Sequence, residues 1–124
     1  MKDSIHKYFQ IGTIQWMSHP PADYEVLDSI KTICCDDFFD ALEVTQMKDD
    51  TIRQKAKDML AQAHMRVCYG AQPRLLGTGL NPNDVDEEGR KKAEQTLLEA
   101  VDEAEYLGAK GIAFLAGKWE EKTK

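Results

Sequence analysis

Glu43 is the residue of this sequence whose type and position best suit chemistry. It lies two residues before the end of a predicted strand, in the segment FFDALEVT. The two-residue period of a strand places Glu43 on one face with Ala41 and Thr45, and Leu42 and Val44 on the other. A carboxylate at the carboxyl end of a strand is positioned for ligation or for acid–base work. The structural alternative is an ion-paired residue at the rim of an edge strand.

The histidines and cysteines form no recognisable metal-binding motif. His19 lies in a proline-rich loop beside the same sheet edge, as a solvated residue or as a ligand or proton carrier. His6 and His64 precede predicted strands, at the edge opposite to the chemistry, so we expect structural roles. Three cysteines without a CxxC spacing argue against a disulfide framework and a zinc site, and Cys34 and Cys35 are expected to pack at a helix end.

The stretch 65–117 predicts the unit that positions these side chains. MRVCYG reads as a strand, and a 15-residue loop rich in Gly, Pro and Asn follows it. An amphipathic helix and the strand GIAFLAG come next, so the two strands must be parallel. The loop is far longer than the usual ~2–6 residues of such connections. Because ligands bind at the carboxyl ends of parallel strands, this loop is a functional candidate.

Two further strand–helix units precede that stretch. The predicted elements are strands Tyr8–Trp16, Phe38–Thr45, Met65–Tyr69 and Ile112–Ala116, with helices Asp23–Cys35, Thr51–His64 and Asp86–Leu107. Asp23 and either Asp49 or Asp50 are expected to act as N-caps, and Gly108 as the left-handed residue after the last helix. The order βαβαβαβ predicts an α/β fold with a parallel sheet and right-handed crossovers.

Polar residues interleave these strands. Gln10, Gly12 and Thr13 stand among the apolar residues of the first one. Parallel strands covered on both faces usually read as continuous apolar runs. The pattern therefore favours one face packed on helices and one that carries small or polar groups. That arrangement fits the inside of a β/α barrel better than a doubly wound sheet.

The composition indicates one globular domain that spans residues 1–124. Apolar residues make up 42% of the chain and charged residues 31%, which is typical of globular proteins. The net charge of −6 argues against nucleic acid and anionic membranes as partners. No apolar run approaches the ~20 residues needed to span a bilayer, and the N-terminus lacks a signal-peptide core. We therefore expect a cytoplasmic protein.

Several motifs resemble those of a known superfamily. IGTIQW resembles its opening strand, FFDALEV its second-strand pattern G-F-D-x-[IV]-E, and YGAQP its third strand end. DEEGRKKAEQTLLEAVDEAEYLGAKGIAFLAG resembles its following helix and fourth strand. In order and spacing, the chain resembles the N-terminal half of the sugar phosphate isomerase/epimerase superfamily, the xylose isomerase-like TIM barrels. The expected fold is thus half of a TIM (β/α)8 barrel, with strands 1–4 and helices 1–3.

The resemblance implies a metal-dependent reaction in the complete barrel. A divalent ion (Mn²⁺, Mg²⁺ or Co²⁺) holds the oxygens of a sugar or sugar phosphate, and two carboxylates move a proton through an enediolate. The family's metal ligands and catalytic glutamates come from strands five to eight, which this chain lacks. We therefore expect no catalytic residue and no tight metal site in this chain, and we expect it to be inactive on its own. What carries over is a substrate-binding rim at the strand ends. Its members are Trp16, Glu43, Tyr69, Gly70, Gly117 and Trp119.

Other functions remain open at this point. Four strands with an exposed lumen face invite self-association or pairing with a C-terminal half, so a non-catalytic half-barrel or assembly module is an alternative. An endonuclease IV-like nuclease would need histidines at the ends of strands three and four. A receiver-like signalling domain would need paired acids after strand one, whereas Asp36 and Asp37 precede strand two and suit a turn.

Overall fold

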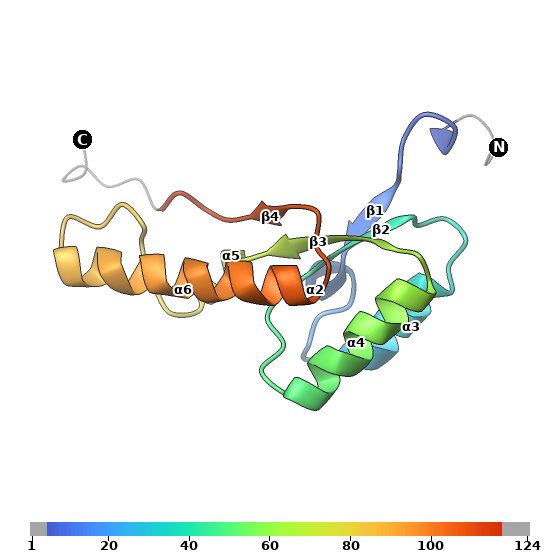
Figure 1. Cartoon of the computed structure of the whole chain (residues 1–124), viewed down its shortest axis with the longest axis horizontal. Helices are drawn as coiled ribbons and strands as arrows, with labels where there is room; N and C mark the ends of the chain where they lie inside the picture. The colour runs from blue at the N-terminus through green and yellow to red at the C-terminus, as the bar shows by residue number, and fades with distance from the viewer. Residues whose placement is uncertain (1–4, 118–124) are drawn as a thin grey trace.

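The computed structural model describes residues 5–117, which form a four-stranded parallel sheet with helices between the strands (Figure 1). Each strand pairs with the next one along the chain, so the order is β1-β2-β3-β4. The strands are β1 Gly12–Ile14, β2 Ala41–Val44, β3 Arg66–Gly70 and β4 Ile112–Ala113. The helices are α2 Gln15–Ser18, α3 Val26–Cys34, α4 Asp50–Gln62, α5 Gln72–Leu76 and α6 Glu87–Tyr106. The α/β class and the alternating parallel arrangement are confirmed.

The two longest helices begin at aspartate side chains. Asp49 Oδ1 accepts hydrogen bonds from the backbone N–H groups of Thr51 at 2.8 Å and Ile52 at 2.9 Å. Asp86 in the same way accepts one from the third residue of α6 at 2.9 Å. After α6, Gly108 has a φ of +75°, the left-handed conformation that favours glycine. The predicted cap at Asp49 and the left-handed Gly108 are confirmed. None of the described helices is long and apolar enough to cross a membrane.

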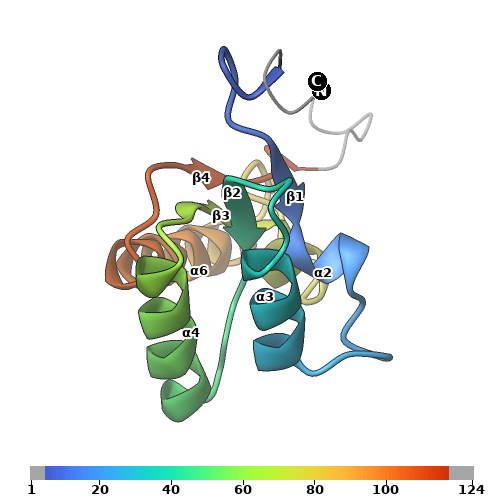
Figure 2. The ribbon, with the colours of Figure 1, turned by 90° about the vertical axis from the view of Figure 1, so that its right-hand side faces the viewer.

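All three longer helices pack against the same face of the sheet. Every second residue of the central strands is buried, and these residues form one core cluster with side chains of α3, α4 and α6. The cluster includes Leu42 and Val44 of β2, Val67 and Tyr69 of β3, Ile30 and Ile33 of α3, Ala56 and Leu60 of α4, and Ala100 and Ala104 of α6. Figures 1 and 2 show the three helices on one side of the strands.

The opposite face carries small or polar side chains. Ala41, Glu43 and Cys68 point to this side and are half-buried. A shallow recess of about 210 Å³ lies over β1, β2 and β3 there, and its lining runs from Gly12 to Cys68. The prediction that Glu43 and Leu42 occupy different faces is confirmed, because Leu42 is fully buried under the helices.

Three predictions of local structure were wrong. The first strand is only three residues long, and α2 follows it directly, so Trp16 lies on a helix rather than at a strand end. The predicted loop after β3 contains α5. Its Pro73 lies in the first turn, where the missing N–H costs no helical hydrogen bond. Asp23 does not cap α3, because the backbone N–H of Asp23 bonds to Pro20 in a turn, and the helix begins three residues later.

Candidate functional site

Four residues at or just after the ends of β1, β2 and β3 lie close together at one edge of the sheet. Glu43 lies in β2 beside Ile14 of β1 and Cys68 of β3, one residue before the strand ends. Gly70 ends β3, and Gln72 opens α5 directly after it. Trp16 belongs to α2, the helix that follows β1. Because the strands are parallel, all of these positions lie at the carboxyl edge, where α/β proteins bind ligands.

Gly70 is the point on which the three side chains converge. A Cβ atom at position 70 would lie 2.1 Å from Cη2 of Trp16 and 2.6 Å from Oε1 of Glu43. It would also lie 2.6 Å from Oε1 of Gln72. At these distances a side chain at position 70 would displace at least one of the three neighbours, so the observed arrangement requires glycine. The glycine lets one aromatic ring and two side-chain oxygens approach the backbone together. We call Trp16, Glu43, Gly70 and Gln72 the strand-end site.

Two oxygens of the strand-end site have no hydrogen-bond partner. Oε1 of Glu43 and Oε1 of Gln72 are buried, and no residue within 5–117 donates to either of them. They lie no more than about 5.2 Å apart, twice the 2.6 Å that separates each from the same point above Gly70. Buried acceptors without donors are rare in folded proteins, and they often mark a place for water or a ligand.

The comparisons with known proteins leave the site to be interpreted by its own chemistry. No protein-family model, no curated protein and no solved structure matches this chain. One fold serves many functions, so the function of this chain depends on the residues of its site.

Among the residues predicted for the rim, the structure brings Trp16, Glu43 and Gly70 together. Tyr69 does not join them, because neighbouring strand residues point to opposite faces and Tyr69 is fully buried on the helical side. Gly117 lies instead against Asn81, with a φ of +113°. Trp119 lies outside the described residues.

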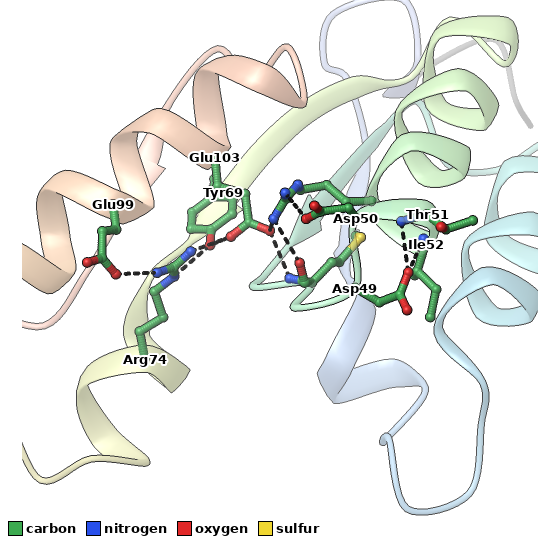
Figure 3. Close-up of polar contacts among 10 residues, drawn as sticks. Asp49, Asp50, Thr51, Ile52, Tyr69, Arg74, Glu99 and Glu103 are labelled. Carbon is green, nitrogen blue, oxygen red and sulfur yellow. Dashed lines mark hydrogen bonds and ion pairs between the residues drawn. The ribbon is translucent and has the colours of Figure 1, made fainter.

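Tyr69 belongs to a buried polar network between β3, α5 and α6 (Figure 3). Its hydroxyl donates to Oε2 of Glu103 at 2.6 Å and accepts from Nε of Arg74 at 2.9 Å. Arg74 also pairs with Glu103 through Nη2. The other carboxylate oxygen, Oε1, accepts from the backbone N–H of Met47 at 2.9 Å. The network thus satisfies its own members and ties the loop after β2 to α6.

Burial and the bond to Glu103 raise the pKa of Tyr69 above its ordinary value, so the hydroxyl keeps its proton. Burial lowers the pKa of Arg74, but the bonds to Tyr69 and Glu103 outweigh it and leave that pKa raised. Arg74 and Glu103 of the network also line a pocket of about 460 Å³, in which basic and acidic side chains are mixed. We interpret the network as structural.

The remaining titratable candidates lie outside the strand-end site. Nδ1 of His6 lies 2.9 Å from Oδ2 of Asp40, and His19 lies 3.1 Å from the hydroxyl of Ser18. Asp36 accepts from the backbone N–H of Phe38 at 2.8 Å, which confirms the predicted turn. Cys34 ends α3, and burial, together with the neighbouring Cys35, raises the pKa of its thiol. All three cysteines are free.

Proposed function

We propose that this chain is the N-terminal half of a β/α barrel of the sugar isomerase/epimerase type, and that its strand ends bind and orient a sugar. The sequential strand order supports a half-barrel, as does the single helix-covered face. A doubly wound sheet carries helices on both faces, whereas the uncovered face of a barrel strand lines the lumen. The small and polar residues of that face suit a lumen lining.

The observation that carries the sugar-binding proposal is the convergence of Glu43, Gln72 and Trp16 on Gly70. A buried acceptor without a donor costs about 1–3 kcal/mol, and a polyhydroxylated ligand supplies donors. The indole of Trp16 adds an aromatic surface on which the C–H groups of a sugar can pack. Aromatic packing combined with a few fixed polar groups is typical of small-molecule sites.

The described residues do not by themselves fit the divalent metal that the resemblance implies. Within residues 5–117, no three His, Cys, Asp or Glu side chains are grouped to hold an ion. The strand-end site offers the carboxylate of Glu43 and the amide oxygen of Gln72, whereas Mg²⁺ takes about six ligands. We therefore assign binding and orientation to this part of the chain, and no proton-transfer step.

A titration of the ¹⁵N-labelled chain with D-fructose and fructose 6-phosphate tests this proposal. We expect the amide signals of Glu43, Gly70 and Ala71 to shift and saturate, and Trp16→Ala to weaken binding roughly tenfold or more, as expected for the loss of a packed aromatic. Glu43→Gln should weaken binding as well, and Glu105→Gln is its control, because it removes the same charge from an exposed position on α6. Strand-end signals that stay unchanged at high sugar concentration would overturn the proposal.

A second candidate, a non-catalytic assembly module, rests on a different surface. A groove between α6 and the segment after β4 is lined by Leu97, Leu98, Val101 and Phe114. The exposed fractions of Leu98, Val101 and Phe114 are 54%, 48% and 50%. Contiguous apolar surface of this kind favours association. Self-association without any sugar binding would favour this candidate.

A further inference from the structure

Of the three atoms nearest to a Cβ position at Gly70, two are hydrogen-bond acceptors and none is a donor. Glu43 and Gln72 both present oxygens near Gly70, and the third neighbour is the ring carbon Cη2 of Trp16. A hydroxyl group bound here could donate one hydrogen, but its lone pairs would face acceptors. An ammonium group has three donors and no lone pair, so it satisfies both oxygens without leaving an unmet acceptor of its own.

Charge favours the same ligand group. In the described part of the chain, Glu43 takes part in no ion pair, so its half-buried carboxylate lacks a counter-charge. The net charge of −6 also draws a cation toward the protein.

We propose that the strand-end site binds the primary ammonium group of a small polyhydroxylated amine, in the first place an amino sugar. The proposal rests on the sugar-binding function above and deepens it by naming the ligand class. The negative charge of a phosphate group would be repelled by the two unpaired oxygens of the strand-end site. If the ligand carries a phosphate, that group must lie elsewhere.

Isothermal titration of the full chain with glucosamine, N-acetylglucosamine and glucose at pH 6 tests the proposal. We expect glucosamine to bind roughly 10- to 100-fold more tightly than the two neutral sugars, as a charge-assisted hydrogen bond gives. Glu43→Gln should abolish this preference, and Glu105→Gln should keep it. Circular dichroism confirms that each variant is folded, and the amide signal of Gly70 reports binding at the site.

The other outcomes separate this proposal from the sugar-binding function. Equal binding of glucosamine and glucose would overturn the ammonium proposal and leave sugar binding in place. Cyclohexylamine that binds as tightly as glucosamine, and depends on Glu43, would support the ammonium site and contradict a sugar ligand. If none of the probes binds, both proposals fall. The lack of a donor to the two oxygens would then be explained by a Gln72 amide turned by 180°, which places its NH₂ group toward Glu43.

Discussion

The Tyr69 hydroxyl donates a 2.6 Å hydrogen bond to Glu103, a residue 34 positions further along the chain. The bond joins the end of β3 to the last turn of α6, on the face of the sheet that the helices cover. Arg74 of α5 bonds to both residues, so β3, α5 and α6 are joined by one buried polar network. Breaking it should affect the whole helical layer.

Glu103→Ala should destabilise the protein by about 3–5 kcal/mol, because it leaves Arg74 buried without its carboxylate partner. Urea unfolding followed by circular dichroism measures this loss. Glu99→Ala is the matched control, since Glu99 lies on the same helix with 57% of its side chain exposed and only a 3.7 Å contact to Arg74. That change should cost no more than about 1 kcal/mol. Equal losses in the two variants would contradict a special role for Glu103.

Stability should fall at alkaline pH because of Tyr69. Its pKa is raised in the folded protein above the ordinary value of about 10. Below pH 10 both states carry the proton and the contribution to stability is complete. Above pH 10 only the unfolded state releases it, so the free energy of unfolding should drop by up to about 1.4 kcal/mol per pH unit.

A comparison with Tyr69→Phe isolates this effect. The stability gap between the wild type and Tyr69→Phe should narrow between pH 9 and pH 11, when measured by urea unfolding. Val67→Ala is the control, because it weakens the same core and keeps the hydroxyl. A gap that stays constant over this pH range would show that the proton of Tyr69 is not linked to folding.

Gly70→Ala should disrupt the strand-end site. The new methyl group would lie 2.1 Å from the ring of Trp16, so the indole must move. In a Trp119→Phe background Trp16 is the single tryptophan, and its fluorescence maximum should shift. Sugar binding should be lost as well. Gly111→Ala is the control, because nothing lies within 4 Å of a Cβ there; an unchanged spectrum of Gly70→Ala would contradict the close approach.

We also expect the chain to self-associate. Within the described residues, β1 and β4 each pair on one side only, and one sheet face is free of the longer helices. Light scattering coupled to size exclusion should give a mass that rises with concentration. Phe114 directly follows β4 and lines the groove beside α6, so Phe114→Asp should reduce the mass through either surface, whereas Gln62→Asp on the exposed side of α4 should not. A monodisperse monomer at all concentrations would count against the half-barrel.

The sequence predicted the arrangement of the longer elements because their signals are local and repeated. The aspartate at position 49 and the apolar stripe of α4 define that helix without any tertiary information. The alternation of Leu42 and Glu43 likewise predicted which side of β2 is buried. The half-barrel itself stays a proposal, since closure depends on elements beyond four strands.

The short helices and the polar network were not predicted. α2 and α5 have four and five residues, too few for a periodic pattern, and tertiary contacts must hold them. Gln72 was missed for this reason, as it stands in a segment read as a loop. Glu103 did carry a signal, because it shares the apolar stripe of α6 with Ala100 and Leu107, where a charged residue needs a partner. Its partner, Arg74, cannot be found from local spacing.

The short helix α5 has one further consequence. Gln72 and Arg74 stand two positions apart on it, and such residues point in different directions from a helix axis. One reaches toward Glu43, and the other is held by Glu103. A ligand that fixes Gln72 would therefore also restrict the Arg74 pair, and by reciprocity any change that loosens that pair would weaken the ligand. Ligand binding on one face of the sheet and the stability of the Arg74–Glu103 pair on the other would thus be coupled through the single turn of α5.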